Sequence, residues 1–225
     1  MSTRLERASL QVRSEAPVAS RAVLEITGLA RQFGSHEVVR ALDLTLAPGE
    51  RTALWGPNGS GKSTVLRCIA GTLDPTRGDV RVDGHRAGTL AARRAVGASL
   101  AQERSFYLRL TGWANLLFFA RLRSSSEREA RLRVAALEEE LELAHITAER
   151  VDRCSTGMVQ QLGFARALLG DPKLILLDEP TRSLDEDARG RLWGALDRRP
   201  GVAVLIATHL KEDVERCDER VDFPH

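Results

Sequence analysis

A glycine-rich run in the first third of the chain has the residue types and spacing that bind a phosphate group. It fits the phosphate-loop pattern G-x-x-x-x-G-K-[ST], with the residues Gly56, Pro57, Asn58, Gly59, Ser60, Gly61, Lys62, Ser63 and Thr64. Glycines let the backbone curl and aim several N–H groups at one anion, and a helix that starts there adds its positive end. Lys62 is expected to reach the β- and γ-phosphates of a nucleotide, and the Ser63 hydroxyl to ligate Mg²⁺.

The surroundings of this loop favour phosphate binding over a glycine-rich turn that binds nothing. The strand-like run 52–55 enters the loop and the helix-like run 65–70 leaves it, which is the context that the motif requires. Arginine supplies most of the positive charge, and the only lysines are Lys62, Lys173 and Lys211. A lysine at the one position where a compact ammonium suits a phosphate therefore favours the phosphate-binding interpretation.

Two acids and a histidine follow apolar runs later in the chain. Residues 174–177 are apolar without alternation, which is typical of a strand buried on both faces of a parallel sheet, and Asp178 and Glu179 come next. Such strand ends bind ligands, so Asp178 is predicted to hold Mg²⁺ and Glu179 to accept a proton from an attacking water. The alternative is that both acids cap the next helix. His209 follows a similar run at 203–207, and alone it would be interpreted as structural.

The remaining pattern predicts the elements that hold these side chains. Strands are predicted at residues 23–26, 41–46, 79–82 and 95–100. Residues 111–143 predict two helices with a break at 124–126, and a further helix begins at Gly157. The acids of the second helix are interpreted as a solvated face and not as a metal cluster; they are Glu138, Glu139, Glu140 and Glu142.

Composition limits the class of protein. The chain has 225 residues, with 33 basic and 31 acidic side chains and a net charge of +2, so the total charge implies no polyanion partner. No apolar run approaches the roughly 18 residues of a membrane span. The first 20 residues mix charged and apolar types, and they are expected to be a mobile leader and not a signal peptide. Cys68, Cys154 and Cys217 fit neither a disulfide framework nor a zinc site.

Together these motifs resemble those of the ATP-binding cassette (ABC) ATPases, the nucleotide-binding subunits of ABC transporters. The resemblance covers about residues 22–222, in the family's motif order. The phosphate loop is similar to the Walker A motif, and Asp178–Glu179 to Walker B. The resemblance also implies roles for residues outside these two motifs. Phe33 would stack on adenine, and Gln102 would contact Mg²⁺ and the membrane partner. His209 would contact the γ-phosphate, and the D-loop would consist of Ser183, Leu184 and Asp185.

The signature motif and the tail depart from the family pattern. Cys154, Ser155, Thr156, Gly157 and Met158 stand where the family has Leu-Ser-Gly-Gly-Gln. Ser155 and Gly157 match, which implies contacts to the γ-phosphate of an ATP held by a second chain. Thr156 and Met158 occur in some exporter subfamilies and are not interpreted as inactivating. After residue 221 the family continues through a strand and a final helix, whereas this chain stops at His225.

The resemblance implies an α/β phosphate-loop NTPase fold. Residues 21–225 would form one cassette domain, with an antiparallel β part near the N-terminus and a helical insert at about 111–155. Two copies, or one copy and a related chain, would sandwich two ATP molecules with Mg²⁺. The dimer would sit on the cytoplasmic face of the inner or plasma membrane, against an integral membrane permease, and would not bind nucleic acid.

Transport in the export direction is expected, because residues 103–116 resemble the ATPases of ABC-2 type exporters. Two alternatives stay open. One is a non-transport ABC ATPase acting on DNA or ribosomes, although the chain has no long coiled coil, second cassette or basic block. The other is a truncated regulatory cassette, suggested by the short tail. The transported molecule is selected by the permease and cannot be read from this chain.

Overall fold

The structure is a computed structural model that describes residues 22–100 and 106–223. Gln102 and the predicted leader 1–20 lie outside the described residues. The strands are β1 (Leu24–Phe33), β2 (His36–Leu46), β3 (Arg51–Trp55), β4 (Arg77–Val82), β5 (His85–Arg86), β6 (Val96–Ser99), β7 (Leu174–Asp178), β8 (Ala203–Thr208) and β9 (Glu219–Asp222). The helices are α1 (Lys62–Ile69), α2 (Leu90–Ala95), α3 (Gly112–Arg121), α4 (Glu127–Glu140), α5 (Ala144–Thr147), the 3₁₀ turn η1 (Val151–Arg153), α6 (Thr156–Leu168), α7 (Glu186–Asp197) and α8 (Lys211–Val214).

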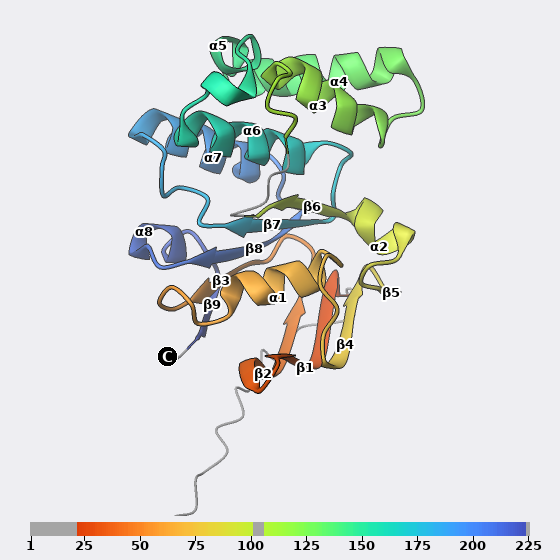
Figure 1. The fold of residues 1–225 in the computed structure, drawn as a ribbon, viewed down its shortest axis with the longest axis vertical. Helices are drawn as coiled ribbons and strands as arrows, with labels where there is room; N and C mark the ends of the chain where they lie inside the picture. Colours follow the sequence, from red (N-terminus) through yellow and green to blue (C-terminus); the bar gives the residue numbers. More distant parts are fainter. Residues whose placement is uncertain (1–21, 101–105, 224–225) are drawn as a thin grey trace, which may run out of the picture.

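The strands form two sheets of different type. The N-terminal sheet has the order β2-β1-β4-β5 and is antiparallel, as the family resemblance implies. The second sheet has the order β6-β7-β8-β3-β9, and all of its strands are parallel. Figure 1 shows helices α3 to α5 at the opposite end of the molecule from the antiparallel sheet. The α/β fold class is confirmed.

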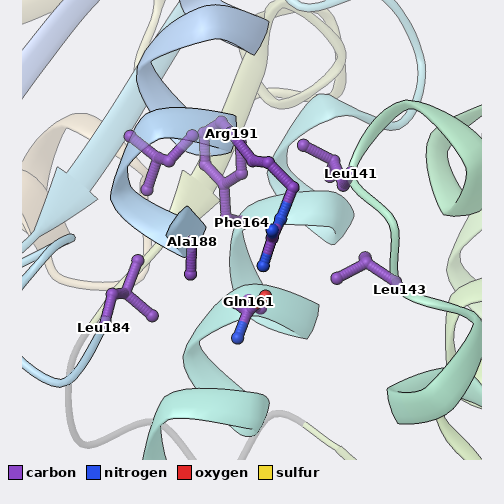
Figure 2. A pocket seen from close by; sticks show the side chains of 8 residues that line it. Leu141, Leu143, Gln161, Phe164, Leu184, Ala188 and Arg191 are labelled. Atoms are coloured by element: carbon purple, nitrogen blue, oxygen red, sulfur yellow. The ribbon is translucent and has the colours of Figure 1, made fainter. Parts of the chain in front are cut away.

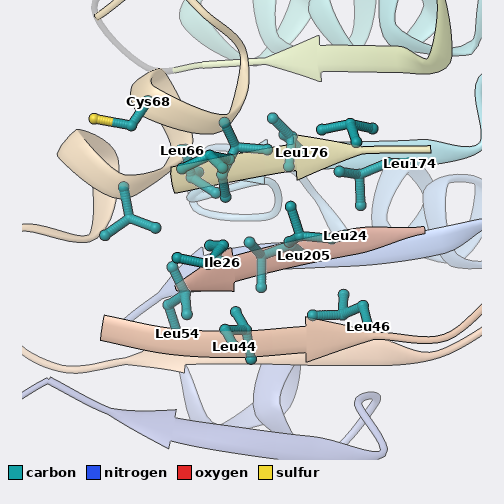
Figure 3. Packing of buried hydrophobic residues seen from close by; sticks show 14 of the residues in the cluster. Leu24, Ile26, Leu44, Leu46, Leu54, Leu66, Cys68, Leu174, Leu176 and Leu205 are labelled. Atoms are coloured by element: carbon teal, nitrogen blue, oxygen red, sulfur yellow. The ribbon is translucent and has the colours of Figure 1, made fainter. Parts of the chain in front are cut away.

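The parallel sheet is buried on both faces, and alternate residues of β7 belong to different cores. Leu174 and Leu176 pack in a cluster with the antiparallel sheet and helix α1 (Figure 3). Ile175 and Leu177 pack in the other cluster, with the helices α3 to α7. This explains the apolar run without alternation, because each face of β7 meets a different layer. Helices α1 and α6 consequently lie on opposite faces of the parallel sheet.

The two predicted helices around residues 111–143 are present, and their starts have a local cause. Thr111 and Ser126 cap α3 and α4, since their hydroxyl oxygens accept hydrogen bonds from Ala114 N and Glu129 N at 3.1 and 3.2 Å. One face of the second helix and the residue after it are buried, with Ala130, Val134, Leu137 and Leu141 all in the core. No helix in the described part of the chain combines the length and the apolar character needed to cross a bilayer.

Two features differ from the sequence prediction. The acids of α4 are not all on a solvated face: Glu140 accepts hydrogen bonds from Arg198 and Arg199, which lie at and just beyond the end of α7. These contacts hold the pKa of Glu140 below its usual range. The tail forms strand β9, which pairs with β3 and makes the edge of the parallel sheet.

The three cysteines are free thiols. Burial raises the pKa of Cys68 to about 11 and that of Cys217 to about 12, because the thiolate loses solvation. Burial also raises the pKa of Cys154, the residue before the signature serine. All three thiols are therefore weak nucleophiles near neutral pH.

Candidate nucleotide-binding site

Three loops that carry the predicted chemistry meet at one edge of the parallel sheet. Strands β7, β8 and β3 are neighbours and run in the same direction. Their carboxyl ends therefore lie side by side, and the residues that follow them share this edge. β3 delivers the phosphate loop, β7 delivers Asp178 and Glu179, and β8 delivers His209. Ligands bind at this edge in open α/β sheets.

Two glycines of the phosphate loop are fixed by close backbone contacts. Gly61 has φ +100°, and a Cβ there would lie 2.7 Å from the carbonyl oxygen of Val38. A Cβ on Gly56 would lie 2.4 Å from the carbonyl oxygen of Phe223, just beyond β9. Neither position accommodates a side chain, so both require glycine for the loop to pack against these backbones.

The loop also has hydrogen-bonding groups that fit a phosphate. Gly61 is the N-cap residue of helix α1 and has no side chain, so the first N–H groups of α1 have no side-chain acceptor there. The hydroxyl oxygen of Ser60 is buried and has no hydrogen-bond partner among the described residues. Buried donors without partners are uncommon, and an anion bound in the loop would satisfy them.

Lys62 is buried at the start of α1, with 5% of its surface exposed. Its ammonium donates hydrogen bonds to the carbonyl oxygens of Gly56 at 2.7 Å and Pro57 at 2.8 Å. Burial lowers the pKa of Lys62, whereas the nearby carboxylates of Glu179 and Asp178 act in the opposite direction. The lysine and both acids therefore share one electrostatic environment, as the sequence predicts.

Glu179 and His209 are in direct contact. The His209 ring nitrogen Nδ1 lies 2.8 Å from the carboxylate oxygens of Glu179. Since an ionised carboxylate only accepts hydrogen bonds, Nδ1 is the donor and carries a proton. The other ring nitrogen, Nε2, can then donate to a phosphate oxygen only when the imidazole is protonated on both nitrogens.

The backbone of Glu179 is held in an unusual conformation. Its φ is +50°, a left-handed value that side-chain-bearing residues rarely adopt. Its N–H donates to the carbonyl oxygen of Ala207 at 2.8 Å, and its carbonyl oxygen accepts from the side-chain amide of Gln160. Strained backbone of this kind persists where surrounding bonds fix it, and it occurs often at functional sites.

The signature residues begin helix α6 and contact the D-loop. Ser155 caps the helix, because its hydroxyl oxygen accepts from Met158 N at 3.2 Å. Thr156 is exposed at the first position of the helix. A Cβ on Gly157 would lie 2.5 Å from the carbonyl oxygen of Ser183, so only glycine fits there. Helices α6 and α1 pack on opposite faces of the sheet, so the signature and the phosphate loop of one chain stand at the starts of helices from different layers.

Gln160 is a link that sequence reasoning missed. Besides its bond to the Glu179 carbonyl, its side-chain oxygen accepts from Ser183 N at 3.3 Å. It therefore ties the signature helix to both the Walker B glutamate and the D-loop. The motif alone gives no signal for this role, because a glutamine on a helix is usually a surface residue.

The remaining predicted site residues, in the D-loop and at the end of β1, differ in how exposed they are. Leu184 of the D-loop is buried in the core, and Asp185 caps α7 by accepting from Ala188 N at 2.8 Å. Phe33 is 46% exposed at the end of β1, and the Arg31 guanidinium lies 4.4 Å from its ring centroid. Phe33 is thus accessible to a flat ligand, with a cation next to its ring.

A small cavity lies between the helical region and α7 (Figure 2). Its volume is about 10 Å³, at the lower limit for one water molecule. Leu141 and Leu143 line it from one side and Ala188 and Arg191 from α7 on the other. It is too small for a nucleotide, and none of the predicted phosphate-loop residues lines it.

Comparisons with known proteins agree with this geometry. The sequence model of the ABC transporter family matches residues 39–182. The chain is 38% identical over 205 residues to the uncharacterised ABC transporter ATP-binding protein YdbJ of Bacillus subtilis (strain 168), covering 88% of this chain and 65% of that protein. It is 35% identical over 221 residues to the Nod factor export ATP-binding protein I of Rhizobium meliloti (strain 1021), covering 96% of this chain and 66% of that protein. The chain thus spans just under two thirds of the length of these two relatives.

Solved structures support the same fold. An ATP-binding subunit of an ABC transporter superposes with a TM-score of 0.81 at 29% identity, covering 89% of this chain and 85% of that one. A dimeric ATP-binding cassette, MJ0796, in a post-hydrolysis state bound to ADP and Pi, has a TM-score of 0.81 at 24% identity, covering 89% and 94% of the two chains.

Proposed function

Because the chain belongs to the ABC transporter family, we propose that it is the ATP-binding and ATP-hydrolysing subunit of a transporter. It powers transport by a separate integral membrane permease, and it lies on the cytoplasmic face of the membrane beside that permease. The observation that carries this function is the meeting of the Lys62 loop with the Glu179–His209 pair at one sheet edge. Similarity to a Nod factor export ATP-binding protein supports the export direction.

The phosphate loop, residues 56–64, holds the phosphates of ATP. Its backbone N–H groups and the Ser60 hydroxyl donate to phosphate oxygens, and Lys62 neutralises charge on the β- and γ-phosphates. Phe33 stacks on the adenine, which fits its exposure at the end of β1. Asn58 and Gly59 form the exposed turn of the loop.

Ser63, Asp178 and Gln102 would hold Mg²⁺. The donor set fits, because Mg²⁺ prefers oxygen ligands and commonly takes one or two carboxylates together with substrate phosphates. When bound, the ion neutralises charge that develops on the phosphoryl oxygens. Asp178 ends β7 beside β8, and only 7% of its surface is exposed.

Glu179 and His209 act on the transferred phosphoryl group. Glu179 orients the attacking water and accepts its proton, and His209 donates from Nε2 to the γ-phosphate. Their contact through Nδ1 keeps the imidazole at a fixed angle to the carboxylate. Catalysis is then mainly positioning and electrostatic stabilisation.

A second copy of the cassette completes each site. Ser155 and Gly157 of one chain contact the γ-phosphate held by the other, with Thr156 and Met158 beside them. In such a two-fold dimer, both motifs of one chain face the same partner, with the phosphate loop of each chain opposite the signature of the other. The D-loop residues Ser183, Leu184 and Asp185 lie beside the signature helix of their own chain, since the Ser183 carbonyl oxygen approaches Gly157 and its N–H donates to the Gln160 side chain.

The decisive experiment uses Glu179→Gln, which keeps the shape of the side chain and loses the carboxylate. Hydrolysis should fall by roughly 10²-fold or more, so ATP stays intact between two chains. Size-exclusion chromatography with light scattering should then detect a dimer with ATP and Mg²⁺ and a monomer without nucleotide. A monomer at saturating ATP, with ATP binding intact, would contradict a homodimeric sandwich.

A second substitution tests the signature's role in that dimer. Ser155→Asp in the Glu179→Gln background keeps an acceptor that caps α6 but places negative charge at the γ-phosphate. It should abolish the ATP-dependent dimer. The matched control is Ser126→Asp, the same change at the cap of α4, and the dimer should persist in it. Loss of the dimer in both variants would remove the signature from the interface.

A further inference from the structure

Asp213 is a buried acid that the sequence motifs do not include. It lies in α8, the short helix after His209, and 1% of its surface is exposed. Its carboxylate accepts hydrogen bonds from the hydroxyl of Thr181 at 2.7 Å and from that of Thr208 at 3.0 Å. Both threonines are buried as well, at 2% and 0% exposure.

The two threonines flank the reacting groups. Thr181 comes two residues after Glu179, and Thr208 comes directly before His209. The Thr208 hydroxyl also accepts a hydrogen bond from Leu210 N at 3.0 Å, so it fixes the backbone on both sides of the histidine. One carboxylate therefore joins the loop after β7 to the loop after β8.

We propose that Asp213 is a positioning residue for ATP hydrolysis, which holds Glu179 and His209 in contact by tying together the two loops that carry them. The inference rests on the proposed function. Asp213 acts through Thr181 and Thr208, and its carboxylate makes its hydrogen bonds with these threonines.

The chemistry of the cluster favours a dedicated role. A buried carboxylate loses solvation, which raises the pKa of Asp213, and the two hydroxyl donors offset part of that cost. Two carboxylate oxygens can accept from two hydroxyls at once, one from each loop. An asparagine of the same shape has a single acceptor oxygen, so it can accept from only one of the two hydroxyls, and its amide group would have to donate to the other threonine.

The experiment compares Asp213→Asn with a pair of substitutions at Thr208. Thr208→Val keeps the volume and removes the hydroxyl, whereas Thr208→Ser keeps the hydroxyl. We expect kcat to fall roughly 10- to 100-fold in Asp213→Asn and Thr208→Val, as for a displaced catalytic group. KM for ATP should stay within about 2-fold, because the phosphate loop is unchanged. Thr208→Ser should keep most of the activity, and thermal melts confirm that each variant folds.

A double-mutant cycle that combines Asp213→Asn with His209→Ala distinguishes positioning of the catalytic groups from a general effect on the stability of the fold. If Asp213 acts through placement of the histidine and its partner, Asp213→Asn should cost little further kcat when His209 is already alanine. Multiplicative losses in the double variant would overturn the inference. The inference would also be overturned if a folded Asp213→Asn variant kept its kcat, or if only its KM for ATP rose.

A measurement without turnover distinguishes this inference from the proposed function. The nitrogen chemical shifts of the His209 ring report the Nδ1 hydrogen bond to Glu179. They should move in Asp213→Asn and Thr208→Val and stay in place in Thr208→Ser. If the wild-type chain binds ATP and hydrolyses none, alone or with a permease, the proposed function fails, whereas unmoved shifts in Thr208→Val refute the positioning role.

Discussion

Lys62 uses part of its hydrogen-bonding capacity on its own loop. Two donors of the ammonium go to the carbonyl oxygens of Gly56 and Pro57, and an ammonium has three. One N–H therefore remains for a phosphate oxygen, from a side chain whose position the loop already fixes. A pre-positioned cation of this kind loses little freedom when the nucleotide binds.

Replacing this lysine tests the phosphate loop directly. Lys62→Ala should weaken ATP binding and reduce hydrolysis by roughly 10²-fold or more, as for the loss of one preorganised charge contact. Calorimetry measures the binding, and phosphate release measures the turnover. Lys173→Ala is the matched control, because Lys173 is exposed and pairs with Asp83. Turnover near the native rate in Lys62→Ala would refute the role of the loop.

At the scale of residues, the sequence predicts functional residues within one motif, and it does not predict the hydrogen bonds that join two motifs. The phosphate loop and Glu179 follow from local spacing, whereas the role of His209 follows only from the family resemblance; the structure brings all three to one edge. Gln160 and Asp213 bond to residues 19 and 32 positions away. A pattern along the chain does not specify such pairs, because folding brings them together.

At the scale of elements, apolar runs predict the buried strands β7 and β8, whereas the edge strand β9 is not predicted. Only Val221 of its four residues is buried, so its pattern is too weak to mark a strand. Phe223 follows β9 and is 7% exposed, and its N–H donates to the Trp55 carbonyl oxygen at 2.6 Å. The end of this strand thus packs against the start of the phosphate loop at Gly56.

Phe223→Ala should destabilise the fold by about 3 kcal/mol, as for removing a buried aromatic side chain. The midpoint of thermal unfolding should fall, and ATP with Mg²⁺ should restore part of it by binding the folded state. Leu132→Ala is the control, because Leu132 is 59% exposed on α4 and its loss should matter little. Equal shifts in the two variants would show that Phe223 is not a structural anchor.

At the scale of the whole molecule, we expect the proposed permease to bind an aromatic patch on the surface. It consists of Phe106, Tyr107, Phe118 and Phe119, whose rings meet edge to face at centroid distances of 5.2 to 6.1 Å. The Arg166 guanidinium lies 5.3 Å from two of these rings, which links the patch to the signature helix α6. Tyr107 and Phe118 are exposed, as interface anchors are before binding.

The double substitution Tyr107→Ala with Phe118→Ala should leave ATP binding intact and uncouple hydrolysis from transport. The reason is that these rings form the exposed half of the patch and are not among the residues proposed to bind the nucleotide. Vesicles that contain the permease allow both rates to be measured together. Leu122→Ala, at the exposed end of α3, is the control and should transport normally. Normal transport by the double variant would remove the patch from the coupling surface.

The layer arrangement is only partly predictable. The unbroken apolar run of β7 predicts that both faces of the strand are covered, and this is confirmed. It does not specify that α1 covers one face and α6 the other, because either helix is amphipathic enough to pack on either side. That assignment comes from the connections of the whole chain.

The low reactivity of two of the thiols makes the chain a convenient background for site-directed labelling. With pKa values of about 11 and about 12, Cys68 and Cys217 hold only about 10⁻⁴ or less of their thiol as thiolate at pH 7. An added cysteine at an exposed site such as Leu132 would therefore take up a maleimide dye far faster. Energy transfer between dyes on two chains could then follow the approach of the protomers in real time, once the partly exposed Cys154 has been replaced.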